Sequence, residues 1–276
     1  MSDETVLVTG CSSGIGRATA ELFAEEEWVV YATSRDEGDL SELAEAGCET
    51  AALDVTDAEE IERVVDRVLD EQGRLDCLVN NAGYAQYGPL EDVPADQLHR
   101  QFEVNVYGPH RLARAVLPHL REAGDGTIVN VSSVQGRIAT PGAGAYSGSK
   151  FALEAMSDAL RGEVEGFGVD VVLVEPGPVE TNFTERSLEE LAEGLDRREN
   201  VYGWLYDAIE DASVLSGSSP LAVAPREVAA VIHEAAETTD PHARYPVGPA
   251  ARYLLLTRFL PDGLRDFAFR LVRRVA

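Results

Sequence analysis

The chain of 276 residues has almost no lysine: Lys150 is the single one, and the other 22 basic residues are arginines. Positive charge of any kind is scarce, because 49 acidic residues outnumber 23 basic ones and give a formal net charge of −26. So acidic a surface repels the phosphate backbone of nucleic acids. We therefore expect no nucleic-acid partner.

The same composition resembles that of proteins from salt-loving archaea. Repulsion across such a surface is screened in concentrated salt, where the Debye length falls to about 3 Å near 1 M. An ordinary acidic bacterial protein is the alternative interpretation. The near-absence of lysine favours a halophilic source.

Cysteine and long apolar runs are also scarce. Cys11, Cys48 and Cys77 have no metal-ligand spacing, and an odd number argues against a disulfide framework. No stretch reaches the roughly 20 apolar residues of a membrane-spanning helix, and the first residues lack a secretion pattern. We expect reduced cysteines, no metal site and a cytoplasmic protein.

What the chain does have is a regular alternation of strand-like and helix-like segments. The strand-like segments are rich in β-branched residues: Val6–Val8, Trp28–Thr33, Thr50–Leu53, Cys77–Asn80, Thr127–Val131, Val169–Val174 and Arg244–Val247. The helix-like segments follow helical spacing: Gly14–Glu26, Asp39–Ala46, Asp57–Gln72, Ala95–His119, Ala145–Gly166 and a helix from Pro225. The alternation predicts an α/β fold, a doubly wound Rossmann domain over residues 1–276 with a parallel sheet of about seven strands.

Two segments near the C-terminus depart from this pattern. Residues 178–224 combine a helix-like acidic stretch, Ser187–Arg198, with a Ser/Gly-rich one, and we interpret them as a substrate lid. Residues 250–276 form a basic helical tail. Its apolar face either docks on the protein body or lies on an anionic membrane. Docking is the favoured interpretation, and membrane contact the weaker one.

A glycine-rich loop, TGCSSGIG, follows the first strand and opens the first helix. Gly10, Gly14 and Gly16 suit a tight turn in which backbone N–H groups approach a pyrophosphate at a helix N-terminus. Their spacing differs from that of ordinary dinucleotide folds and resembles the short-chain dehydrogenase/reductase family. The resemblance implies a nicotinamide cofactor on this loop, which also includes Ser12, Ser13 and Ile15.

The residues at the end of the second strand indicate whether the cofactor is NAD(H) or NADP(H). Ser34 stands where family members that bind NAD carry an acid, and Arg35 follows it. A guanidinium matches the geometry of a 2′-phosphate, so we predict NADP(H), although Asp36 is close by. The family pattern places further cofactor contacts at Asp54, Val55, Asn81, Ala82, Gly83, Tyr146, Lys150, Pro176, Gly177, Val179 and Thr181.

Tyr146 and Lys150 lie four residues apart and so project from one helix face. Ser133 comes 13 residues before Tyr146, the usual family separation, and Asn105 matches the fourth catalytic position. The resemblance implies that Tyr146 transfers the proton and Ser133 orients the substrate oxygen. It further implies that Lys150 holds the ribose and lowers the tyrosine pKa, and that Asn105 holds a water next to Lys150.

The predicted function is hydride transfer between NADP(H) and a small-molecule alcohol or carbonyl. The C-terminal part resembles the family branch that acts on bulky apolar carbonyls, and this resemblance implies a bulky apolar substrate. The alternatives are a regulatory protein that senses NADP(H) without turnover, and a lyase or epimerase on the same scaffold. Family members commonly pair through their long helices, so we expect a homodimer or homotetramer through Ala95–His119 and Ala145–Gly166.

Overall fold

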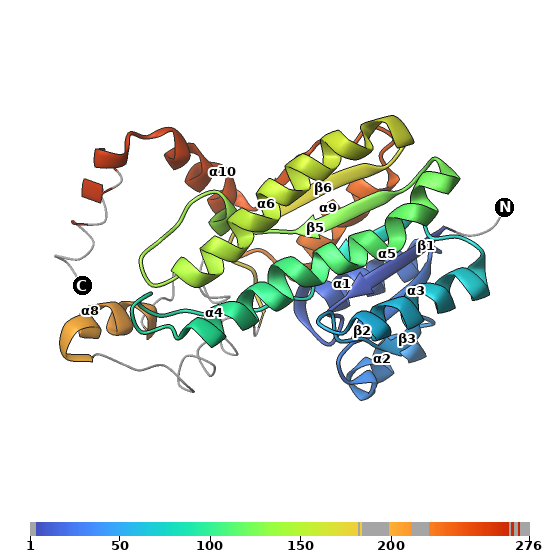
Figure 1. Ribbon diagram of the computed structural model, residues 1–276, viewed down its shortest axis with the longest axis horizontal. Coiled ribbons are helices and arrows are strands. Elements are labelled where there is room, and N and C mark those ends of the chain that lie inside the picture. Colours follow the sequence, from blue (N-terminus) through green and yellow to red (C-terminus); the bar gives the residue numbers. More distant parts are fainter. Residues whose placement is uncertain are drawn as a thin grey trace.

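A single parallel sheet organises the molecule (Figure 1). The computed structural model describes residues 4–181, 183, 199–210, 221–264, 266–267 and 270. The seven strands run in the order β3-β2-β1-β4-β5-β6-β7, and all their pairings are parallel. They are β1 Thr5–Thr9, β2 Val29–Ser34, β3 Glu49–Ala52, β4 Cys77–Asn80, β5 Thr127–Val131, β6 Asp170–Pro176 and β7 Arg244–Val247. The predicted doubly wound fold is confirmed.

Helices cover both faces of the sheet (Figure 1). One layer contains α1 Gly14–Glu25, α2 Ser41–Glu45 and α9 Pro225–Glu237, and the other contains α3 Ala58–Gln72, α5 Gly108–Ala123 and α6 Gly144–Val164. Side chains alternate along β1, so Val6 and Val8 face Phe23 and Ile232 while Leu7 faces the second layer. Each face of the sheet therefore has its own apolar core.

The termini of α3 show how local sequence sets these boundaries. The Asp57 carboxylate accepts hydrogen bonds from the backbone N–H groups of Glu59 and Glu60, as an N-cap does. Gly73 follows the last turn with φ +73°, a left-handed conformation that glycine adopts without strain. Between them the apolar side chains lie on one face and are buried, as the helical spacing predicts.

The predicted helix Ala95–His119 is interrupted in the structure. It consists of α4 Ala95–Phe102, a π-helical turn η2 Glu103–Tyr107, and α5. Pro109 has no N–H to donate to the carbonyl of Asn105, so the α-helical pattern cannot continue there. π-helical turns occur mostly as single insertions of this kind, often at functional sites.

The C-terminal part differs most from the predictions. α8 Glu199–Glu210 was not predicted, whereas α10 Pro249–Leu256 and the 3-10 turn η5 Thr257–Phe259 lie in the segment predicted as a helical tail. The helix-like stretch Ser187–Arg198 lies outside the described residues. Val179 and Val223 pair in an isolated parallel bridge, which joins the two ends of the segment 178–224. In Figure 1, α8 and the chain after α10 lie at the same end of the molecule.

Part of the tail after α10 is exposed to solvent. Leu264 and Phe267, two residues of its predicted apolar face, are 55% and 53% exposed, and residues 271–276 lie outside the described residues. Within the ranges described, no helix combines the length and the apolar character that crossing a membrane requires.

Candidate active site

A cleft of about 1000 Å³ runs along the carboxyl ends of the strands. Strand order reverses between β1 and β4, the place where open α/β sheets bind ligands. Of the predicted site residues, only Gly16 and Asn105 do not line it. Those that do are Gly10, Ser12, Ser13, Gly14, Ile15, Ser34, Arg35, Asp54, Val55, Asn81, Ala82, Gly83, Ser133, Tyr146, Lys150, Pro176, Gly177, Val179 and Thr181.

The glycine-rich loop forms one end of the cleft and is closely packed. Gly10 has φ +74°, and a Cβ there would lie 2.8 Å from the Cα of Ala82. Gly16 does not line the cleft, because it packs beneath the loop. A Cβ on Gly16 would lie 2.2 Å from the carbonyl oxygen of Gly10, so its role is to let the helix approach the strand.

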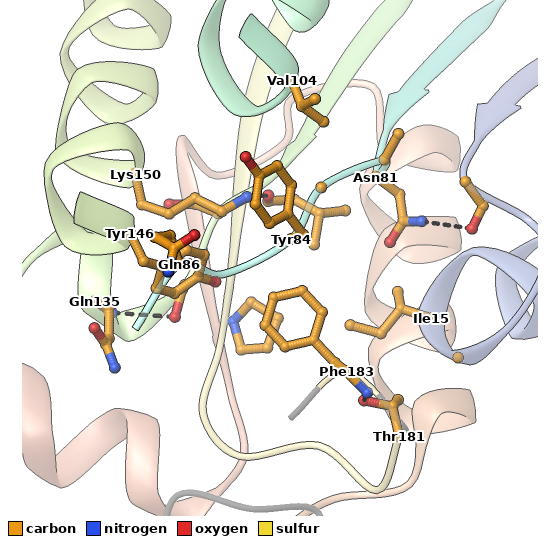
Figure 2. Close-up of a pocket in the computed structure, with 18 of the residues that line it drawn as sticks. Ile15, Asn81, Tyr84, Gln86, Val104, Gln135, Tyr146, Lys150, Thr181 and Phe183 are labelled. Atoms are coloured by element: carbon orange, nitrogen blue, oxygen red, sulfur yellow. Dashed lines mark hydrogen bonds between the residues drawn. The ribbon is translucent and has the colours of Figure 1, made fainter. Parts of the chain in front are cut away.

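Asn81 ties the loop after β4 to the glycine-rich loop. Its amide Nδ2 donates to the carbonyl oxygens of Thr9, at 2.9 Å, and Gly10, at 3.1 Å. The backbone N–H groups of Asn81 and Ala82 donate to the hydroxyl of Thr9 at 3.0 and 3.1 Å. The two loops therefore hold each other, with Asn81 visible at the cleft wall in Figure 2.

Arg35 is exposed at the rim of the cleft, directly after β2. Among the described residues no hydrogen bond or ion pair engages its guanidinium. Asp36, the nearby acid, turns to the backbone: its Oδ1 accepts from the N–H of Gly38 at 2.9 Å and caps the following turn. The Ser34 hydroxyl donates to the Asp36 carbonyl. Asp36 thus does not neutralise Arg35.

Asp54 and Val55 line the same end of the cleft, after β3. Asp54 Oδ1 accepts from both the N–H and the hydroxyl of Thr56, each at 2.8 Å, which holds the carboxylate at the edge of the sheet. Val55 packs on Gly108, where a Cβ would come within 2.9 Å of its Cγ2. A glycine at the start of α5 thus lets the β3 loop approach the helix.

Tyr146 and Lys150 project from the first turns of α6 into the middle of the cleft (Figure 2). Both side chains are nearly buried, with 7% and 6% exposed. Ser133, after β5, caps the turn η3 Val134–Gly136 by accepting from the N–H of Gln135 at 3.1 Å. Its hydroxyl also forms a hydrogen bond with Tyr146. The predicted Ser, Tyr and Lys therefore meet in one place.

The pKa values of Tyr146 and Lys150 differ from the expectation that Lys150 lowers the pKa of Tyr146. Burial raises the pKa of Tyr146 well above its usual 10, and only the hydrogen bond with Ser133 opposes this. Burial also lowers the pKa of Lys150 from 10.5 to about 8. Lys150 Nζ donates to the carbonyl oxygen of Val131 at 2.8 Å and lies 5.9 Å from the centre of the Tyr146 ring. In this structure desolvation outweighs the attraction between ammonium and phenolate.

Asn105 lies in the η2 turn, behind the cleft wall, with 1% of its surface exposed. Its Oδ1 accepts from the N–H of Tyr84 at 3.2 Å, and its Nδ2 donates to the Tyr84 carbonyl at 2.9 Å and to the Ser149 hydroxyl at 3.1 Å. The side chain thus positions the loop that carries Tyr84. No direct hydrogen bond joins it to Tyr146 or Lys150, and its assignment to hold a water next to Lys150 stays a prediction.

Aromatic side chains flank Tyr146. The ring of Tyr87 lies 6.3 Å away and that of Phe183 lies 6.0 Å away, both measured between ring centres. Tyr84 and Tyr87 line the cleft. Leu254, on α10, also lines the cleft, and it belongs to the C-terminal segment that was predicted to dock on the protein body. Other residues that line the cleft and were not predicted from the sequence include Thr56, Gln86, Gln135 and Ile138.

Among the residues of the expected lid that the structure describes, only the first few line the cleft. Val179, Thr181 and Phe183 line it, but no residue of α8 does. Leu205 and Tyr206 of α8 are buried elsewhere, and the Tyr206 hydroxyl donates to Asp92 at 2.5 Å. That the whole segment 178–224 closes over a substrate stays a prediction.

Neither a metal-binding cluster nor a reactive thiol is found in the part of the chain that the structure describes. Within the described part of the chain, no group of three or more His, Cys, Asp or Glu side chains could hold a metal ion. The three cysteines are buried and unbridged, and burial raises the pKa of Cys11 to about 12 and that of Cys48 to about 11. Such thiols are poor nucleophiles.

Comparison with known proteins places these features in a family. The model of the family described as short chain dehydrogenase matches residues 4–192. A 3-ketodihydrosphingosine reductase of Bacteroides thetaiotaomicron is 32% identical over 274 residues, with 98% of each chain covered. An NADPH-dependent 3-dehydrocapnine reductase of Ornithobacterium rhinotracheale is 34% identical over 269 residues, covering 92% of this chain and 93% of the relative.

A solved short-chain dehydrogenase from Streptomyces avermitilis superposes with a TM-score of 0.82 at 36% identity, covering 99% of this chain and 98% of that one. Similar solved structures contain NAD in some cases and NADP in others. The glycine cradle, the Asn81 anchor and the Ser133–Tyr146–Lys150 cluster fit a nicotinamide dinucleotide in the cleft. The chain therefore belongs to the short chain dehydrogenase family, whose members are oxidoreductases that bind a nicotinamide cofactor.

Proposed function

We propose that this protein is an NADP(H)-dependent oxidoreductase that interconverts an alcohol and a carbonyl, with Tyr146 as the proton donor and acceptor. The observation that carries the proposal is that Tyr146 is buried beside Ser133 and Lys150 at the centre of the cleft. One end of this cleft is formed by a glycine-rich loop of the kind that binds phosphate groups. No observation favours the regulatory alternative, in which the cofactor would bind without turnover.

The preference for NADP(H) rests on Arg35. Its guanidinium is exposed at the cleft rim, and Asp36 is occupied in a backbone cap. A guanidinium can bind a phosphate through two parallel hydrogen bonds, and no acid at position 34 competes for a ribose 2′-hydroxyl. The printed name of the 3-dehydrocapnine reductase, NADPH-dependent, agrees with this assignment.

The nicotinamide, when bound, would supply or accept the hydride. The chain's own residues handle the proton and the geometry. Ser133 would hydrogen-bond the substrate oxygen, and Tyr146 would donate its phenolic proton to that oxygen in reduction or take it in oxidation. Lys150, held by Val131, is placed to bind the ribose hydroxyls and to carry a positive charge near the phenolate that remains.

We propose a bulky apolar carbonyl compound as the substrate class. Tyr87, Phe183, Ile138 and Leu254 give the cleft an apolar and aromatic lining, of which Tyr87 and Phe183 flank Tyr146. The names of the two relatives also specify oxidised substrates, 3-ketodihydrosphingosine and 3-dehydrocapnine, for reductases. A cytoplasmic location, a halophilic source and a homo-oligomeric state belong to the same proposal.

The test is an assay of purified protein with NADPH and NADH against aldehydes, cyclic ketones and long-chain 3-keto compounds, at low and at molar salt. We expect NADPH consumption with the apolar ketones, at higher efficiency than with NADH. Tight NADPH binding without turnover of any carbonyl or alcohol would favour the sensor. Higher efficiency with NADH would overturn the cofactor assignment alone.

A further inference from the structure

The chain after Gly248 exposes an unusual row of large apolar side chains. Phe259 is 82% exposed, Tyr253 75% and Leu256 63%, and the row continues through the end of the described chain. We name it the tail face, and it consists of Tyr253, Leu256, Phe259, Leu260, Leu264 and Phe267. An exposed apolar patch of this kind on a monomer commonly marks an interaction site.

The charge of this segment is opposite to that of the rest of the chain. From residue 252 to the end there are six arginines and two aspartates, a net charge of +4 on a chain whose total is −26. Arg252 and Arg258 alternate with the first residues of the tail face. Arginine stems can lie along apolar surface while their guanidinium groups reach water or phosphate. Apolar side chains bordered by arginine are typical of surfaces that bind anionic bilayers.

The opposite side of α10 belongs to the protein body. Ala251 is fully buried, and Leu254 lines the catalytic cleft. Tyr253 and Leu256, on either side of Leu254 in the sequence, point to solvent instead. In Figure 1, α10 and the chain that follows extend outward from the body. One short helix therefore separates the cleft from the tail face.

We propose that the tail face docks on an anionic lipid bilayer and places the mouth of the cleft at the membrane surface. A bilayer accepts a row of protruding apolar side chains without a complementary groove, and its phosphates match the local positive charge. Delivery of a membrane-dissolved substrate past α10 into the cleft follows from this, and that part rests on the proposed function. The structure thus favours the interpretation that sequence reasoning ranked second.

A second copy of this chain is the competing occupant. Its acidic body would also attract the arginines of the tail. Apolar side chains on α4 and α6, such as Leu98 at 36% and Phe151 at 41% exposed, are available for such pairing. The tail face is therefore not needed to explain a dimer.

The experiment is co-sedimentation of the full chain with phosphatidylglycerol or phosphatidylcholine vesicles, in low and in molar salt. The test variant is Leu256→Glu with Phe259→Glu, which changes two tail-face residues outside the cleft. The matched control is Phe167→Glu, because Phe167 is an aromatic 49% exposed beside Arg121, between α6 and β6. Light scattering of each protein without vesicles reports the oligomeric state.

We expect the wild type and the control to bind anionic vesicles at least tenfold more strongly than neutral ones, and the test variant to lose this binding. All three should reduce a short water-soluble ketone equally, so a failure of docking is distinguishable from a failure of the proposed activity. Absence of vesicle binding by the wild type would overturn the proposal. So would a test variant that binds vesicles normally but dissociates from dimer to monomer, since the tail face would then be a protein interface.

Discussion

Arg244, the first residue of β7, forms an ion pair with Glu154 on α6, with 3.0 Å between Nε and Oε2. Glu154 lies one helical turn after Lys150, and 5% of its side chain is exposed. Arg244 also lies 3.3 Å from Glu175 of β6, and Arg137 lies 3.0 Å from the same carboxylate. Two buried acids and two arginines from four segments thus form a network directly behind the catalytic helix.

We predict that Arg244→Ala destabilises the protein by about 3 kcal/mol, because it leaves two buried carboxylates facing a single arginine. Urea unfolding measures this difference. Arg161→Ala is the control, since Arg161 bonds only the half-exposed Asp158 at the surface of α6. If Arg244→Ala costs no more than this control, the network does not stabilise the fold.

The same network predicts a pH dependence of stability. Burial, together with the charge of Glu154, raises the pKa of Glu175 from 4.5 to about 7 against the opposing effect of Arg137 and Arg244. Between these values the folded state binds more protons than the unfolded state, so the free energy of unfolding falls as pH rises from 4.5 to 7. Glu175→Gln should remove this decrease, as measured by urea unfolding across the window. A decrease of equal size in the variant would assign it to another group.

The role of Arg35 at the rim of the cleft is tested by the preference between NADPH and NADH. Arg35→Ala removes the guanidinium, and we expect the KM for NADPH to rise by about 10- to 100-fold, the effect of one to two charge-assisted hydrogen bonds. The KM for NADH serves as the internal control and should stay within about twofold. Adding Ser34→Asp should invert the preference. If the KM for NADPH is unchanged in Arg35→Ala, Arg35 does not bind the cofactor.

The proposed oligomer is tested on α6. Phe151 projects outward from this helix, and a glutamate there would place a charge in any apolar interface with a second copy. We expect light scattering to show a dimer or tetramer for the wild type and a smaller species for Phe151→Glu. A wild type that is monomeric at all salt concentrations contradicts the predicted assembly.

Short motifs made much of the site predictable. The glycine-rich loop, the Asn81 segment and the Tyr146–Lys150 pair are each contiguous or one helical turn apart, so their spacing in the sequence fixes their spacing in space. Strand and helix periods predicted the sheet, because the central strands β1, β4 and β5 are buried on both faces and each covering helix on one. Pro109 was a local signal for the interruption at η2, but the helical spacing of the apolar residues around it led to the prediction of one continuous helix.

Contacts between distant segments were not predictable in this way. Leu254 reaches the cleft only because α10 follows β7 to the sheet edge, and the Arg137–Glu175 pair joins residues 38 positions apart. No periodicity in either segment signals such a meeting. The apolar spacing of Leu264 and Phe267 was recognised, but spacing alone does not say whether a face meets the body or the surroundings.

The most direct test of the account is the turnover of Tyr146→Phe with NADPH and an apolar ketone that the wild type reduces. The phenol would be needed for proton transfer and not for cofactor binding, so we predict a loss of kcat of at least 1000-fold, within the range assigned to general acid catalysis. NADPH affinity, measured by fluorescence titration, should change less than about threefold. A variant that retains a tenth of the wild-type rate would contradict the central claim that Tyr146 transfers the proton.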